Sequence, residues 1–313
     1  MIQCPVAQSY GLSTSLLERL TSFEIVKVND VAMEGEAAEE ERERREKESM
    51  LKSLKGLSAF GCRVFTLVRN YRSNVHILSL FNTLFYGEVL FPSADVFKSS
   101  RLANLPFLPR QGVPILFHHA EGVEKRDRDS PSWYNLEEVK IIREKILYLI
   151  EKIGVHPSEI GVITPYAKQV EKFKNALYRD YRDILVGTTE AFQGLERRVI
   201  LISMVRSSSE NVTIDRKFRI GFLSNPKRLN VAISRAMELI VVVGNGNLLA
   251  SFDPLWHHFL SLLESLKVYV GPPIPPLVVR KEEKEKEKEK EGKGKEEGEE
   301  FEFEPAPYKR IEM

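Results

Sequence analysis

Residues 225–243 read NPKRLNVAISRAMELIVVV and contain both kinds of element from which the fold is built. Asn225 is a favourable helix N-cap, and Pro226 is a favourable first helical residue, so we expect a helix over Pro226–Met237. The run Leu239–Val243 that follows is apolar at every position. Such a run is typical of a strand in the middle of a parallel sheet that helices cover on both faces.

The same alternation of helix and strand continues on the N-terminal side of this stretch. Val199–Met204 is a second run that is apolar on both faces. Further strands are predicted at Arg63–Val68, Val113–Phe117, Ile160–Thr164 and Ile184–Val186, and further helices at Ser73–Tyr86, Leu136–Ile153, Lys168–Tyr181 and Pro254–Leu266. Strands and helices that alternate in this way predict a three-layer α/β fold with a parallel sheet.

The start of the helix at Leu136 carries its own signal. Asn135 can cap it, and Glu138 stands three residues later, as in a capping box.

Composition limits the class of protein. The chain has 313 residues, of which 42% are hydrophobic and 29% charged, which is enough for a packed core. The formal net charge is only +1, but two Glu-rich segments, 34–48 and 281–300, are acidic, so the remainder is basic. A basic folded body is compatible with a polyanionic ligand.

Two further absences point to the interior of the cell. The only cysteines, Cys4 and Cys62, exclude a disulfide scaffold and a cysteine-rich zinc site, and they suit a reducing compartment. The sequence has neither an apolar run of membrane-spanning length nor an N-terminal signal segment, so we expect a cytoplasmic protein.

We expect three parts along the chain. Residues 1–62 form a lead-in that contains a charged insertion at 34–52, and residues 63–270 form the α/β domain. Residues 271–313 form a disordered charged tail, because this segment alternates Lys and Glu and has no apolar face to bury.

Ligands gather at the carboxyl ends of strands in such folds, and four loop segments are expected there. In Arg69–Ser73, Arg72 could meet an anion or belong to a solvated turn. In Thr164-Pro165-Tyr166, the hydroxyls suit a phosphate–sugar backbone and Tyr166 could stack on a base, or the ring could lie at the edge of the core.

The other two segments are longer. Gly187–Glu196 gathers small, hydroxylated and amide residues, and a binding role and a structural role are equally open. In 225–235, Arg228 and Arg235 stand seven residues apart and share one helix face. Arg235 could act as an arginine finger on a phosphoryl group, or both could be ordinary surface arginines.

Taken together and in order, five stretches resemble the C-terminal motor domain of superfamily 1 RNA helicases, in the Upf-like and Armitage-like group associated with RNA silencing. They are GLSTSLLERL (11–20), LVRNYRSNVHIL (67–78), GVITPYAKQVEK (161–172), VGTTEAFQGLERRVILISMVRSS (186–208) and GFLSNPKRLNVAISRAMELIVVVGN (221–245). Each stretch is weak alone, whereas five in the family's order are specific. The resemblance implies a RecA-like fold and the second motor domain only.

The resemblance also implies roles for matching positions. Arg72 falls on the motif IV arginine and Arg235 on the motif VI arginine finger, both expected to act in catalysis at the γ-phosphate. The positions expected at the nucleotide are Gln193, Gly194, Glu196 and Arg228, and those expected at the nucleic acid are Thr164, Tyr166, Thr188 and Thr189.

One absence shapes the functional hypothesis. The sequence contains no G-x-x-x-x-G-K-[ST] loop and no strand that ends in an Asp-Glu pair. In the family, the first motor domain supplies both, so ATP with Mg²⁺ is expected between this chain and such a domain, in cis or in trans. We therefore expect this chain to provide no metal ligands and to be inactive alone. We expect it to be a fragment, a truncated gene model or half of a split motor.

The expected partners are single-stranded RNA, or DNA, together with RNA-silencing or decay proteins in the cytoplasm or its ribonucleoprotein granules. An alternative is a catalytically inactive remnant that binds RNA or a protein partner. An unrelated nucleotide-binding α/β enzyme would need a Gly-rich phosphate loop or a catalytic triad, and the sequence has neither.

Overall fold

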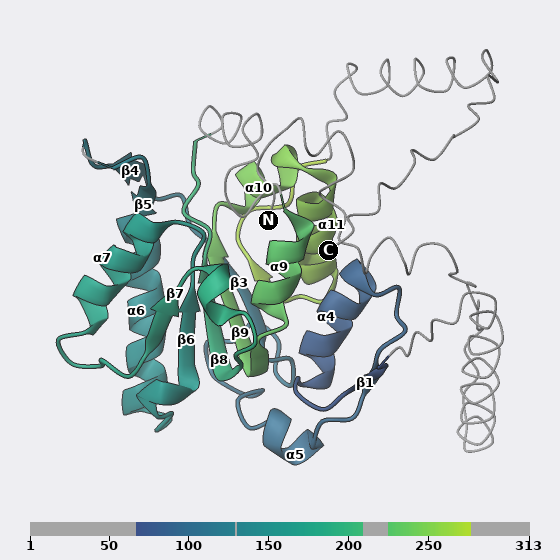
Figure 1. The fold of residues 1–313 in the computed structure, drawn as a ribbon. Coiled ribbons are helices and arrows are strands. Elements are labelled where there is room, and N and C mark those ends of the chain that lie inside the picture. Colours follow the sequence, from purple (N-terminus) through teal and green to yellow (C-terminus); the bar gives the residue numbers. More distant parts are fainter. Residues whose placement is uncertain (1–66, 129, 209–224, 277–313) are drawn as a thin grey trace, which may run out of the picture.

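The computed structural model describes residues 67–128, 130–208 and 225–276. Within them a six-stranded sheet, in the order β10-β3-β9-β8-β6-β7, is parallel throughout and lies between two layers of helices (Figure 1). Its strands are β3 (Ile115–His119), β6 (Ile160–Ile163), β7 (Leu185–Gly187), β8 (Arg197–Ser203), β9 (Ala236–Gly244) and β10 (Tyr269–Val270). The predicted three-layer α/β fold is confirmed.

The two strands that are apolar on both faces lie side by side in the middle of the sheet. In β8, Ile200 and Ile202 face one core, while Val199 and Leu201 face the other. The register pairs Ile200 with Ile240 of β9, which continues the same alternation. Both faces are buried at these positions, and this is why Val199–Ile202 and Leu239–Val243 are apolar throughout.

The helices divide between the two faces of the sheet. On one face lie α4 (Val75–Phe85), α9 (Pro226–Ile233), α10 (Gly246–Phe252) and α11 (Pro254–Ser265), and on the other lie α6 (Leu136–Glu151) and α7 (Ala167–Leu177) (Figure 1). The short helices are α5 (Val96–Ser99), η2 (Pro157–Glu159) and η3 (Thr189–Phe192). None of the helices in the described part of the chain is long and apolar enough to cross a bilayer.

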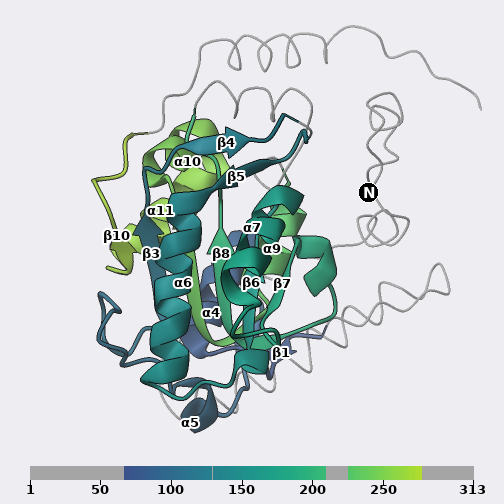
Figure 2. The ribbon, with the colours of Figure 1, turned by 90° about the vertical axis from the view of Figure 1, so that its left-hand side faces the viewer.

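Two small strand pairs mark opposite ends of the sheet. The antiparallel hairpin of β4 (Glu124–Arg126) and β5 (Trp133–Asn135) lies beyond the carboxyl ends of the parallel strands (Figures 1 and 2). The parallel pair of β1 (Arg69–Asn70) and β2 (Phe91–Pro92) lies beyond their amino ends, together with α5.

Several sequence-based boundaries need correction. Helix α9 stops at Ile233 rather than at Met237, because Ala236 already joins β9. The strand expected at 63–68 is wrong where it can be compared: Leu67 and Val68 are not in a strand, and β1 pairs only with β2, outside the main sheet. Residues 1–62, and the expected tail beyond 276, lie outside the described residues.

The capping box expected at α6 is also wrong in part. Asn135 caps the helix, because its side chain accepts from the amides of Glu137 and Glu138. The amide of Asn135 itself, however, donates to Gln169 Oε1 at 2.9 Å, and the Glu138 carboxylate points into the core instead.

Candidate functional site

The side chains of Arg72 and Arg235 meet at the amino end of the sheet. The turn that carries Arg72 is fixed first: Asn70 Oδ1 accepts from the amides of Arg72 (3.0 Å) and Ser73 (2.9 Å). Ser73 Oγ then donates to the carbonyl of Ala236 at 2.8 Å. The turn after β1 is therefore tied directly to the first residue of β9, beside Arg235.

The two guanidinium groups both contact Ser234. Arg72 pairs through Nε with the Glu196 carboxylate, and its Nη1 donates to the carbonyl of Ser234 at 3.3 Å. Arg235 donates to Ser234 Oγ at 3.0 Å and to the carbonyl of Leu195 at 3.1 Å. We call Arg72, Glu196 and Arg235 the arginine cluster.

The arginine cluster carries more positive than negative charge. Burial lowers the pKa of the Arg235 guanidinium, and the positive charge of Arg72 lowers it further. Within the cluster, two cations face one carboxylate, which is itself about half exposed at 47%. Such an arrangement favours an anionic ligand, above all one with several oxygens that a guanidinium can grip with two hydrogen bonds.

The loop before β8 lies open next to this cluster. Gln193, Gly194 and Glu196 are all exposed. Gly194 has φ +81°, and a Cβ there would meet nothing within 4 Å. Glycine is favoured by the left-handed backbone, and the open space would let a ligand approach the chain closely.

Arg228 does not join the arginine cluster. Its Nη2 lies 2.7 Å from Glu190 Oε1, so it ties α9 to η3 instead. The sequence placed Arg228 and Arg235 on one helix face, but Arg235 lies beyond the end of α9. In this structure Arg228 therefore contacts η3 rather than the arginine cluster.

The threonines lie at the carboxyl ends of β6 and β7. The amide of Thr164 donates to the carbonyl of Gly187 at 3.1 Å, which joins the two loops. Thr164 and Thr189 are buried, and neither hydroxyl has a hydrogen-bond partner within the described residues. Buried hydroxyls are rarely left unsatisfied, so a partner outside the described side chains, such as water, is expected for these two groups.

Tyr166 is not placed to stack on a base, contrary to the expectation from sequence. It is 5% exposed, and its hydroxyl accepts from Arg206 Nε at 2.7 Å. Of the two alternatives for this residue, the structure favours a ring held inside the edge of the core.

A buried polar network beneath this end of the sheet was missed by the sequence. Ser203 Oγ donates to Glu138 at 2.6 Å, and the amide of Val205 donates to the same carboxylate at 2.9 Å. Gln169 Nε2 donates to Ser203 Oγ at 2.8 Å. Burial raises the pKa of Glu138 to about 8, although these hydrogen bonds lower it. The spacing of Asn135 and Glu138 was the available signal, and it also fitted a capping box.

Val205 itself has a strained backbone. Its φ is +72°, and Arg206 N donates to the carbonyl of Met204 at 2.9 Å across it. A β-branched residue rarely adopts this conformation, which persists only where its surroundings fix it. Here the Glu138 side chain fixes the conformation by accepting a hydrogen bond from the Val205 amide.

The four candidate segments therefore do not all lie at the carboxyl ends of the strands, as the sequence suggested. Arg197 N donates to the carbonyl of Arg235 at 3.1 Å where β8 and β9 begin, so the arginine cluster is at the amino end. The threonines follow the ends of β6 and β7. The loop 188–196 runs between the two, from the end of β7 to the start of β8.

One exposed aromatic residue was also missed. Tyr71 is 69% exposed and stands directly before Arg72. An aromatic ring can stack on a flat heteroaromatic group, and the neighbouring cations can bind an anion that is attached to that group. The available signal was an aromatic residue between Arg69 and Arg72.

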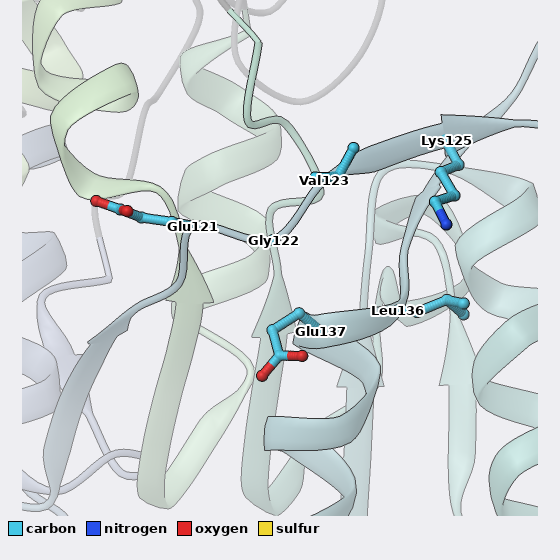
Figure 3. A pocket seen from close by; sticks show the side chains of 6 residues that line it. All are labelled: Glu121, Gly122, Val123, Lys125, Leu136 and Glu137. Carbon is cyan, nitrogen blue, oxygen red and sulfur yellow. The ribbon is translucent and has the colours of Figure 1, made fainter.

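A separate shallow hollow of about 470 Å³ lies beside the β4–β5 hairpin. It is lined by Glu121, Gly122, Val123, Lys125, Leu136 and Glu137, and Figure 3 shows the two carboxylates pointing apart. Its residues are distinct from both groups above. In the described part of the chain, no three His, Cys, Asp or Glu side chains are grouped to hold a metal ion.

Comparison with known proteins shows the family to which the chain belongs. Residues 46–247 match the AAA domain family AAA_12. The human RNA helicase Mov10l1 is 39% identical over 284 residues, which cover 88% of this chain and 21% of that protein. The Drosophila melanogaster protein named "Probable RNA helicase armi" is 36% identical over 230 residues, or 70% of this chain and 19% of that protein.

A more distant relative is the Regulator of nonsense transcripts 1 homolog of Drosophila melanogaster, 33% identical over 222 residues, or 68% of this chain and 18% of that protein. The chain spans between 18% and 21% of the length of these three relatives, and so corresponds to one part of them. The chain belongs to the AAA domain family AAA_12, as a helicase C-terminal domain of the superfamily 1 group that includes the Upf and Armitage proteins.

Proposed function

We propose that this chain forms the second half of an ATP-dependent RNA helicase motor, with Arg235 as the arginine finger and Arg72 as a second ligand of the γ-phosphate. A first RecA-like domain, in cis or in trans, would hold most of the nucleotide and all ligands of its Mg²⁺. Gln193, Gly194 and Glu196 would contact the nucleotide from this side, and Arg228 would hold their loop in place.

The convergence of Arg72 and Arg235 on Ser234 is the observation that carries this proposal. Both guanidiniums are anchored to backbone or hydroxyl oxygens, yet their positive charge is only partly neutralised by Glu196. A triphosphate would supply the missing negative charge at this position. Hydrolysis of bound ATP would drive the opening and closing of the cleft between the two domains.

RNA would lie at the other end of the sheet. The buried hydroxyls of Thr164 and Thr189 lack partners within the described residues, and Thr188 lies beside them. Such groups contact the phosphate–sugar backbone without reading sequence. The RNA helicase names of two relatives favour RNA over DNA. A role with RNA-silencing or decay proteins in the cytoplasm is part of the proposal.

An ATPase assay on a fused protein tests this function. The chain is joined to the first motor domain of a Mov10l1 relative, and ATP turnover is measured with and without single-stranded RNA. Turnover is expected to depend on the fusion and to fall by about 10³–10⁵-fold in Arg235→Ala. Arg179→Ala, at an exposed arginine that follows α7, is the matched control and is expected to have no effect.

The other outcomes are equally informative. A folded fusion whose turnover is the same in Arg235→Ala and in the control would remove Arg235 from the mechanism. A fusion that binds RNA but never hydrolyses ATP would instead support the inactive remnant.

A further inference from the structure

Guanidinium and aromatic side chains alternate from the tip of the β4–β5 hairpin down to the loop after β6. Arg126 Cζ lies 5.3 Å from the ring centroid of Trp133, and Arg206 Cζ lies 4.7 Å from the same centroid. Arg206 Cζ is also 4.9 Å from the ring centroid of Tyr166. We call Arg126, Trp133, Arg206 and Tyr166 the stacking ladder.

The inner half of the ladder is fixed. The Arg206 side chain is 1% exposed and pairs with Glu124, itself 3% exposed, at 3.4 Å. Tyr166 is bonded to Arg206 and buried. A buried guanidinium with a carboxylate and two aromatic rings around it is well satisfied, so this half serves as a rigid base.

The outer half of the ladder faces solvent. Trp133 is half-buried and Arg126 is exposed. The two residues are direct partners in the hairpin register, so they share one face of it. No ion pair to Arg126 is found among the described residues, and its flat guanidinium is the exposed end of the ladder.

The hairpin is held next to the threonine loops. The amide of Lys168, at the start of α7, donates to Ser132 Oγ at 3.0 Å. Asp127 of the hairpin pairs with Lys168 at 3.0 Å and with Lys172 at 3.5 Å. Since Thr164 is only four residues before Lys168, the hairpin stands beside the expected path of the RNA, at the same end of the sheet (Figure 2).

We propose that Arg126 and Trp133 form a stacking site for one base of a single-stranded RNA. Bases in single strands stack on aromatic rings and on guanidinium planes. The exposed Lys125 and Arg128, on either side, would contact the phosphates that flank this base. The inference rests on the proposed function for its ligand, and it lengthens the RNA path beyond the threonines. A protein segment on the hairpin is the competing occupant.

Tryptophan fluorescence of the full chain tests this site directly. The chain has two tryptophans, and Trp256 is 1% exposed within the core, so a change on binding reports Trp133. Addition of an adenosine homopolymer RNA is expected to quench the emission, and Trp133→Phe is expected to abolish the quenching. Binding to the same RNA is measured in parallel by fluorescence anisotropy of a labelled strand.

Substitution of the outermost residue separates stacking from charge. Arg126→Ala is expected to weaken RNA binding about 5- to 10-fold, the lower part of the range for one stacked base, because the position is exposed. Arg126→Lys keeps the positive charge and the salt dependence of binding but lacks the flat guanidinium. Most of the loss of RNA affinity seen in Arg126→Ala should therefore remain. Arg179→Ala is the control, and circular dichroism confirms that each variant is folded.

Several results would overturn the stacking site. They are wild-type affinity in Arg126→Lys, equal affinity in Arg126→Ala and Arg179→Ala, and quenching that persists in Trp133→Phe. If a peptide rather than RNA quenches Trp133, the hairpin is a protein-binding site and the proposal is wrong. Failure of the helicase role is read separately: quenching that depends on Arg126, together with no effect of Arg235→Ala on the fusion, would retain the stacking site alone.

Discussion

Replacement of Glu138 by Gln should remove a large pH dependence of stability. The pKa of Glu138 is raised from 4.5 to about 8, first because the group is fully buried and further because Glu124 is nearby. The folded protein therefore keeps a proton that the unfolded chain releases. The stabilising contribution is fully present below about pH 4.5, declines as the pH rises and is lost above about pH 8.

The magnitude follows from linkage. One proton changes the free energy of unfolding by up to about 1.4 kcal/mol per pH unit, so the loss across this interval reaches at most about 4–5 kcal/mol. Urea unfolding, followed by circular dichroism at a series of pH values from about 5 to 9, measures this slope. As the pH rises, the unfolding free energy of wild type should fall relative to that of Glu138→Gln. Its value at low pH reports only the altered hydrogen bonds to Ser203 and Val205.

Glu137→Gln is the matched control, because this neighbouring carboxylate is exposed. It should leave the slope unchanged. If wild type and Glu138→Gln give parallel curves across the whole pH range, Glu138 does not keep its proton in the folded protein, and the reasoning fails.

Three other substitutions test separate parts of the structure. Asn225→Ala removes the cap that accepts from the amides of Lys227 and Arg228, and thermal unfolding should show a loss of about 0.5–2 kcal/mol. In Gly161→Ala the new Cβ would lie 2.6 Å from the Phe192 ring, so urea unfolding should show a loss of about 1–3 kcal/mol. Glu196→Gln leaves the two arginines without their carboxylate, and calorimetry should show tripolyphosphate binding a few-fold tighter. The gain stays small because the pair is exposed to solvent screening.

The central strands were predictable because both of their faces are buried. Val199–Met204 and Leu239–Val243 became β8 and β9 with small shifts at their ends. The end of α9 was not predictable, because Ala236 is recruited to β9 by long-range contacts, including that of its carbonyl with Ser73 Oγ. Local propensity contains no information about such a partner.

The candidate sites were also predictable only in part. The residue types of the arginine cluster were visible in the sequence, and the structure brings Arg72 and Arg235 together. Their position at the amino end of the sheet was not visible, since it depends on where the loops cross. The β4–β5 hairpin was missed because its strands are only three residues long and β4 consists of charged residues, and Tyr166 was misread because Arg206, forty residues later, covers it.

The crossing loop 188–196 has a mechanical consequence. Its midpoint is pinned, because the Phe192 ring is fully buried against Gly161 of β6. At one end of the loop, Glu196 pairs with the Arg72 guanidinium. At the other end lie Thr188 and Thr189. A triphosphate that bound Arg72 would displace the Glu196 carboxylate from it. Because Phe192 holds the middle of the loop in place, that displacement would be transmitted along a single stretch of nine residues to the threonines at the far side of the sheet.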